Sequence, residues 1–111
     1  MAEQVKTKPG IHESIVTEVA SWPGVTARPH SLGGTEFRVG RVEIGHLHGD
    51  RVADLPFPRS IRDELVAAGS AKPHHVLPDS GWVSRWIEGP DEVVEVVALF
   101  RKNYERYAKR R

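Results

Sequence analysis

The sequence predicts an α+β domain in which an antiparallel meander and a second hairpin form one sheet, with three helices packed mainly on one face. Apolar residues recur at helical spacing in three separate segments, and the middle of the chain alternates with a period of two. Tight-turn signals at Gly40-Arg41 and Gly49-Asp50 separate the alternating runs. Together these observations predict the element order α-β-β-β-β-α-β-β-α.

Length and composition set the first limits on function. The chain has 111 residues, so we expect a single domain over 11–111 behind a disordered leader over 1–10. It contains no cysteine, which excludes a disulfide framework, a thiolate zinc site and a cysteine nucleophile, and fits a reducing, cytoplasmic location. A net charge of +1 argues against nucleic acid as a partner, and no apolar run approaches the roughly 20 residues of a membrane span.

The first predicted helix covers residues 11–21 and ends before Pro23. Its apolar stripe, at spacings of four, four and three, consists of Ile11, Ile15, Val19 and Trp22. A short strand follows over 25–30. Pro29 confines this strand to an edge of the sheet, because proline has no N–H to donate to a neighbouring strand.

Three further strands are predicted over 35–39, 42–48 and 51–57, joined by the two tight turns. The first turn places Phe37 opposite Ile44. One face of the meander then collects its apolar side chains, Phe37, Val39, Val42, Ile44, Ala53, Leu55 and Phe57. A slip of one residue would invert this face, so its coherence supports the predicted register.

The same register decides where the polar side chains of the meander lie. It places His46 opposite Ala53, so that His46 and His48 point to the apolar face, at its rim. It also places Glu43 across from Arg38 on the opposite face, which predicts a cross-strand ion pair.

The second predicted helix begins near Pro58, where Ser60 and Asp63 resemble a capping box. Its inward residues are Ile61, Leu65 and Ala68. The second hairpin consists of strands over 72–77 and 82–87. The third helix opens at Pro90, and its predicted buried stripe is Val93, Val97, Phe100, Tyr104 and Tyr107.

Histidine is the residue type that points most directly to chemistry, because four of the six histidines fall in two pairs. His46 and His48 are two apart on a predicted strand, so both point to one face and can converge on one ion or ligand. His74 and His75 are adjacent, so only one of them is expected to join a pocket. We favour His75, which shares its predicted face with Trp82.

Further side chains complete the predicted site. Trp82 and Trp86 lie on one face of the second hairpin and are candidates for an aromatic wall that binds a flat ligand. Asp54, on the polar face of the meander, is a weaker candidate for ligand binding. The sequence has no Gly-rich phosphate loop, no Gly-x-Ser-x-Gly elbow and no His-Glu-x-x-His zinc helix, so those enzyme classes lack their usual parts.

Four runs of residues carry a family resemblance: 41–48 (Arg-Val-Glu-Ile-Gly-His-Leu-His), 54–58, 74–78 and 81–83. They resemble the small luciferase domain family, which holds many uncharacterised bacterial proteins and the luciferase of bioluminescent fungi. The fungal member adds O2 to a hydroxylated pyrone-type phenolic luciferin without flavin or ATP. The resemblance implies that His46, His48 and His75 are catalytic and that Trp82 lies in the substrate site.

Three functions are compatible with these observations. The first is a small-molecule-binding domain or minimal cofactor-independent oxygenase, with His46 or His48 as the base that deprotonates a phenolic or enolic substrate. The second is a metal-binding domain with His46, His48 and His75 as ligands, whose open position resembles that of catalytic zinc sites. The third is a noncatalytic module that binds a protein or nucleic acid, for example through the basic run over 101–111.

Overall fold

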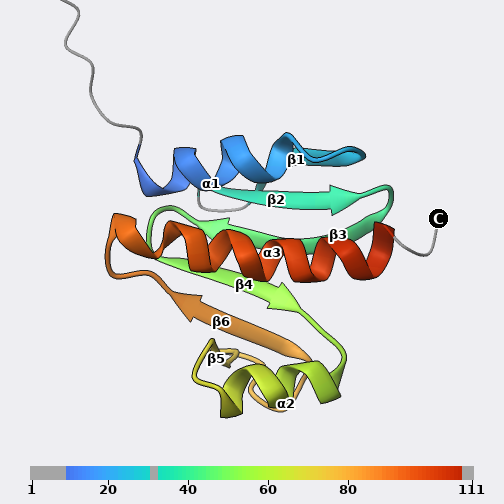
Figure 1. The fold of residues 1–111 in the computed structure, drawn as a ribbon, viewed down its shortest axis with the longest axis vertical. Helices are drawn as coiled ribbons and strands as arrows, with labels where there is room; N and C mark the ends of the chain where they lie inside the picture. Colours follow the sequence, from blue (N-terminus) through green and yellow to red (C-terminus); the bar gives the residue numbers. More distant parts are fainter. Residues whose placement is uncertain (1–9, 31–32, 109–111) are drawn as a thin grey trace, which may run out of the picture.

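The protein was analysed as a computed structural model, which describes residues 10–30 and 33–108 (Figure 1). The predicted leader lies outside these residues except for Gly10. Within the described ranges the chain forms one sheet with the strand order β1-β2-β3-β4-β6-β5. The strands are β1 (Val25–His30), β2 (Gly34–Val39), β3 (Val42–His48), β4 (Val52–Pro56), β5 (Lys72–Pro73) and β6 (Trp82–Trp86). The helices are α1 (Ile11–Ala20), α2 (Arg59–Ala67), the short 3-10 helix η2 (Pro90–Glu92) and α3 (Val93–Ala108).

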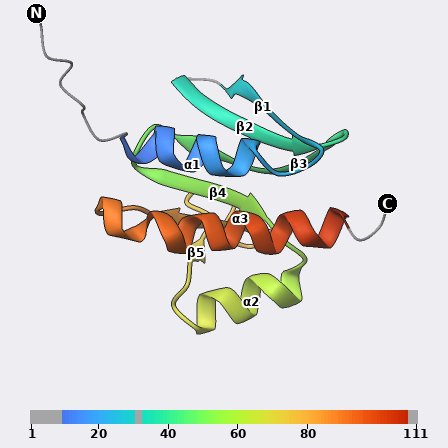
Figure 2. The same cartoon turned by 45° about the horizontal axis from the view of Figure 1, so that its top comes forward.

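The predicted α+β class and element order are confirmed. All neighbouring strands pair antiparallel, and β1 with Pro29 lies at an edge. Helices α1 and α3 lie side by side over one face of the sheet, and α2 lies toward β5 and β6 (Figures 1 and 2). We call the opposite face the helix-free face.

The core fills the space between the sheet and the helices. From the strands it takes Phe37, Leu47, Ala53, Leu55 and Val83, and from α1 and α3 it takes Ile15, Val19, Val96 and Phe100, all with no exposed surface. The predicted stripe of the first helix is therefore correct at its centre. On α3 the buried side is Val96, Leu99, Phe100, Asn103 and Tyr104, whereas the predicted Val93, Val97 and Tyr107 are only half-buried. The predicted stripe followed the apolar residues alone and so left out Asn103, which is fully buried.

The register of the meander differs from the predicted one in two places. Val39 does face Val42, but the register then shifts and Phe37 faces Gly45 instead of Ile44, because β3 carries a bulge. The second turn contains Arg51 as a third residue, so that His48 faces Val52. The sequence prediction assumed two-residue turns and unbroken strand pairing, so it could not include either change.

These two shifts move the histidines to the other side of the sheet. His46 faces Asp54 rather than Ala53, and Leu47 takes the core position between the two histidines. The prediction that His46 and His48 point to the apolar face is therefore wrong. They lie on the helix-free face together with Asp54, because successive side chains of a strand alternate between faces.

Three local predictions around α2 and the second hairpin are also wrong. Pro58 precedes α2 without any side-chain cap, so Ser60 belongs to the first turn and forms no capping box. Of the predicted inward residues Ala68 is exposed. The strand predicted over 72–77 ends at Pro73, because the next residues form a turn. In that turn the backbone N–H groups of Val76 and Leu77 donate to the His74 ring instead of to a neighbouring strand.

Asn103 fastens α3 to the sheet at the bulge. Its amide nitrogen donates hydrogen bonds of 2.9 Å to the carbonyls of Ile44 and Pro56, and its carbonyl accepts one from Arg106. Asn103 and Ile44 are fully buried, whereas Pro56 is half-buried. The side chain thus ties the bulged residue of β3 to the end of β4.

We expect Asn103→Ala to lower the free energy of unfolding by about 1–3 kcal/mol, because it leaves the buried carbonyl of Ile44 and the half-buried carbonyl of Pro56 without this donor. Urea denaturation followed by circular dichroism measures this change. Lys102→Ala, one residue away on the exposed side of α3, is the control and is expected to change stability by less than about 0.5 kcal/mol. Equal stabilities of the two variants would contradict the role given to Asn103.

Candidate functional site

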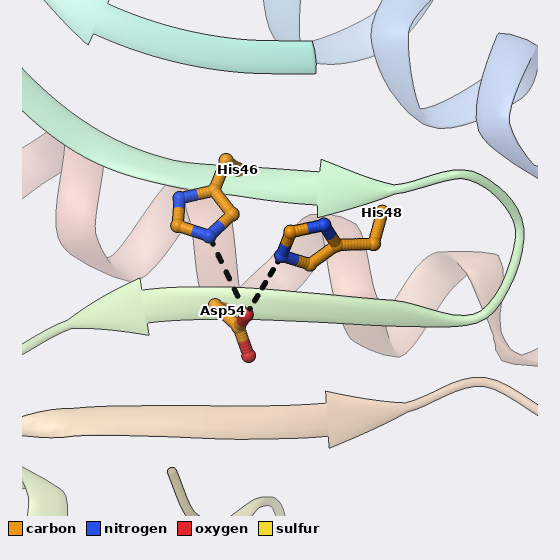
Figure 3. A group of neighbouring side chains, drawn as sticks. All are labelled: His46, His48 and Asp54. Carbon is orange, nitrogen blue, oxygen red and sulfur yellow. Dashed lines mark ion pairs between the residues drawn. The ribbon is translucent and has the colours of Figure 1, made fainter. Parts of the chain in front are cut away.

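The centre of the site is the carboxylate of Asp54, which is fully buried in the middle of the helix-free face. On β4, Asp54 lies between His46 of β3 and Ser84 of β6 in one row across three strands. Its Oδ1 accepts a 2.7 Å hydrogen bond from the Ser84 hydroxyl. Figure 3 shows His46 and His48 pointing toward its carboxylate.

Four imidazoles converge on the other oxygen of Asp54. The distances from Oδ2 to Nε2 are 3.4 Å for His46, 3.2 Å for His48, 3.5 Å for His74 and 3.3 Å for His75. Burial raises the pKa of Asp54, but interactions with His46, Ser84 and His75 outweigh it and hold that pKa well below its usual range. Asp54 is therefore a carboxylate at every physiological pH.

A second carboxylate, that of Glu43, contacts His46 on the side away from Asp54. Nδ1 of His46 donates a 2.6 Å hydrogen bond to Glu43, which leaves Nε2 facing Asp54. The bulge makes this possible, because it brings two residues three apart onto the same face of β3. Burial lowers the pKa of His46, but Asp54 and Glu43 outweigh it and raise the pKa to about 9. The predicted Glu43–Arg38 ion pair does not form; Arg38 pairs with Glu36 instead.

His74 and His75 both reach Asp54, so the prediction that only one could do so is wrong. They lie in a turn rather than a strand, and their rings stack with centroids 4.5 Å apart. Nδ1 of His74 accepts hydrogen bonds from the backbone N–H groups of Val76 at 3.1 Å and Leu77 at 3.0 Å. Because one nitrogen of a neutral imidazole is a donor when the other is an acceptor, Nε2 of His74 carries the proton and points it at Asp54.

His48 and a fifth histidine, His30, both lie beside the His46 ring. Burial and the neighbouring His46 lower the pKa of His48, despite the opposing effect of Asp54. The His30 ring stacks on that of His46 with centroids 4.3 Å apart, and its Nδ1 lies 3.3 Å from Glu36. Sequence analysis missed His30, whose only signal is its place at the end of the edge strand β1, which pairs with β2 next to β3.

The convergent side chains border a pocket of about 380 Å³. It is lined by His46, His48, Asp54, His74, His75, Val76, Leu77 and Trp82. The Trp82 ring lies 5.4 Å from that of His46, between centroids. Trp86 shares the face of Trp82 on β6 but lines a different cleft, so the two tryptophans do not form one wall.

The donor atoms of the site form two groups with the spacing of metal ligands. In His46, His48 and Asp54, and again in Asp54, His74 and His75, the ligand atoms lie within 4.8 Å of one another. The first group is a set of two histidines and one carboxylate, backed by Glu43. In the second group the tautomer of His74 places a proton on the atom that would have to bind the metal.

The fold and the site define a small α+β domain with a histidine–carboxylate centre on the helix-free face of its sheet. The family model described as Luciferase domain matches residues 41–103, which span β3 to most of α3 and contain Asp54 and every residue that lines the pocket. The chain therefore belongs to the Luciferase domain family, as its sequence motifs predict. Comparison with curated proteins and with solved structures gives no match. None of the helices in the described ranges is long and apolar enough to cross a membrane.

Proposed function

We propose that this domain binds one divalent transition-metal ion through His46, His48 and Asp54. The observation that carries the proposal is the convergence of four Nε2 atoms on one buried carboxylate oxygen. An oxygen of this kind has only about two lone pairs to offer. The distances of 3.2–3.5 Å also exceed the roughly 2.7–2.9 Å of a charge-assisted hydrogen bond. Donor atoms so arranged are better satisfied by a cation than by one another.

The chemistry of the donor set favours a particular kind of ion. Two histidines and one carboxylate with open positions are typical of non-haem iron(II) oxygenases, and imidazole also suits zinc, copper and nickel. When bound, such an ion supplies a Lewis acid and, if it is iron, a site for O2. Glu43 fits the outer-shell carboxylate that fixes the tautomer of a ligating histidine.

The remaining residues have roles that follow from their contacts. Nε2 of His74 lies 3.5 Å from Asp54 with its proton directed at the carboxylate, and so helps to orient it. His75 lies across Asp54 at the mouth of the pocket, where it is half-exposed and accessible to a ligand. Val76, Leu77 and Trp82 give the pocket an apolar side suited to a small organic molecule.

Metal content and a cobalt titration test the proposal. We expect purified, untagged protein to contain about one transition-metal ion per chain. After removal of that ion with a chelator, Co²⁺ should bind with a saturable visible absorption at one equivalent. Substoichiometric metal in the purified protein together with the absence of a saturable cobalt spectrum would contradict the proposal.

The pH dependence of stability provides a separate prediction for the metal-free protein. The folded pKa of His46, about 9, lies above the ordinary histidine pKa of 6.5. A group whose pKa is raised by folding stabilises the folded state fully at pH values below its pKa in the unfolded chain. That stabilisation is lost as the pH rises through its pKa in the folded protein. The melting temperature should therefore fall between pH 6.5 and 9, whereas metal affinity should rise because binding displaces the proton. In His46→Gln the fall should be absent; an equal fall would contradict the assignment.

A second candidate function is oxygenation without a metal. It is favoured by the lowered pKa of His48, which keeps this imidazole neutral and able to accept a proton at pH 7. The proton of a phenolic or enolic substrate would pass to His48, and the anion would supply the electrons that reduce O2 as the C–O bond forms. Reprotonation of the resulting peroxide by His48 closes the step. O2 uptake that persists in chelated protein would support this function over the metal-dependent one, and uptake only with metal would exclude it.

A further inference from the structure

A second cleft lies beside the pocket on the helix-free face. It has a volume of about 300 Å³ and is lined by His48, Arg51, Val52, His75 and Trp86. His48 and His75 line both hollows, so these two rings stand between them. A ligand in the second cleft would therefore reach the Asp54 centre from the side opposite to Trp82.

The floor of this cleft is one row of residues across the sheet. His48 faces Val52 between β3 and β4, and Val52 faces Trp86 between β4 and β6. Trp86 is 42% exposed, which leaves a large aromatic surface open. The His75 ring stands at 61° to it, with centroids 5.7 Å apart. The cleft thus offers a flat apolar floor with an aromatic edge.

The positively charged side chain of Arg51 also borders this cleft. The backbone of Arg51 is fixed between strands, since its N–H donates to His48 at 3.2 Å and its carbonyl accepts from Ile87 at 2.9 Å. Its side chain is exposed, and in the part of the chain that the structure describes no carboxylate lies within 4.0 Å of it. Of the arginines on the strands, Arg38 pairs with Glu36 and Arg85 with Glu92, whereas Arg28 on β1, like Arg51, has no carboxylate within 4.0 Å among the described residues.

We propose that this cleft binds a flat, conjugated carboxylic acid, with its apolar part on Trp86 and Val52 and its carboxylate on Arg51. A guanidinium matches a carboxylate with two parallel hydrogen bonds, and an aromatic floor suits a planar group. Placed in this way, the ligand directs its far end past His48 toward Asp54. Only this last point rests on the proposed function; the contact with Arg51 does not.

The test uses trans-cinnamate and its neutral amide, cinnamamide, added to metal-free protein. The chain has three tryptophans, so its indole N–H groups give three NMR signals, and Trp86→Phe assigns one of them. Cinnamate should shift the Trp86 signal and leave that of Trp22, which is buried on the helix side, unchanged. Cinnamamide should bind at least tenfold more weakly. An unmoved Trp86 signal, or equal affinities for acid and amide, would overturn the proposal.

Arginine variants and a cobalt-binding measurement distinguish failure of this inference from failure of the proposed metal site. Arg51→Gln should weaken cinnamate binding at least tenfold and remove the preference for the acid, whereas Arg28→Gln, an exposed arginine on the edge strand, should change neither. Unchanged affinity in Arg51→Gln overturns the proposal. If the protein binds no cobalt but cinnamate still shifts Trp86, the proposed function fails alone. If cobalt binds and Trp86 does not respond, this inference fails alone.

Discussion

Replacement of Gly45 by alanine is expected to lower the free energy of unfolding by about 2–6 kcal/mol, from about 1–3 kcal/mol of backbone strain and about 1–3 kcal/mol of overpacking. Gly45 has φ +149°, a conformation that side chains rarely adopt. An added Cβ would lie 2.6 Å from the Phe100 ring and 3.0 Å from the carbonyl oxygen of Asp54. A domain of this size is typically stable by only about 5–15 kcal/mol, so a large part of its stability would be lost.

Thermal and urea denaturation of Gly45→Ala measure this loss, and Gly40→Ala provides the matched control. Gly40 also has a positive φ, +61°, but nothing lies within 4 Å of its added Cβ. Gly40→Ala should therefore cost only the backbone strain, about 1 kcal/mol. If the two variants were equally stable, the close approach of Phe100 to β3 would not be the cause. Because Gly45 adjoins the bulge, the variant should also lose metal binding where it still folds.

Replacement of Asp54 by asparagine is expected to weaken metal binding by at least about 100-fold, since loss of an outer-shell partner alone typically costs 10–100-fold. The substitution keeps the shape of the side chain and an acceptor oxygen for Ser84, but removes the charge on which four imidazoles converge. Competition between the protein and a chromophoric chelator for Co²⁺ measures the affinity.

Two further variants make this a graded series. Glu43→Gln keeps a hydrogen-bond acceptor for His46 but removes the charge, so it should weaken binding by about 10–100-fold. Asp63→Asn removes a carboxylate from the exposed side of α2 and should leave the affinity unchanged. An Asp54→Asn protein that binds cobalt as tightly as Asp63→Asn would place the ion elsewhere.

The sequence predicted the elements well, because helical and strand periodicity are local properties. The strand over 42–48 and the edge strand over 25–30 coincide with β3 and β1. Register was predicted less well, because a bulge is decided by contacts from elsewhere in the chain. Here Asn103, 59 positions away from Ile44 in the sequence, holds the bulged carbonyl.

The orientation of the histidines was wrong for the same reason, although one local signal favoured the correct face. Leu47, between His46 and His48, fits the core only if both histidines point away from it. The residues themselves were predictable, since a His-x-His spacing puts two rings on one face in either register. The participation of His74 was not, because it depends on a turn whose N–H groups bind its own ring.

The helix-free face has a consequence for how this domain can diversify. Along β3 beyond the bulge, β4 and β6, odd-numbered residues such as Leu47, Leu55 and Val83 pack under the helices, and even-numbered residues such as His48, Val52 and Trp86 face the ligand side. Alternate residues of the same strands thus serve two purposes, one set forming the core and the other forming the ligand-binding face. New ligand preferences can evolve by changing one set while the other stays constant.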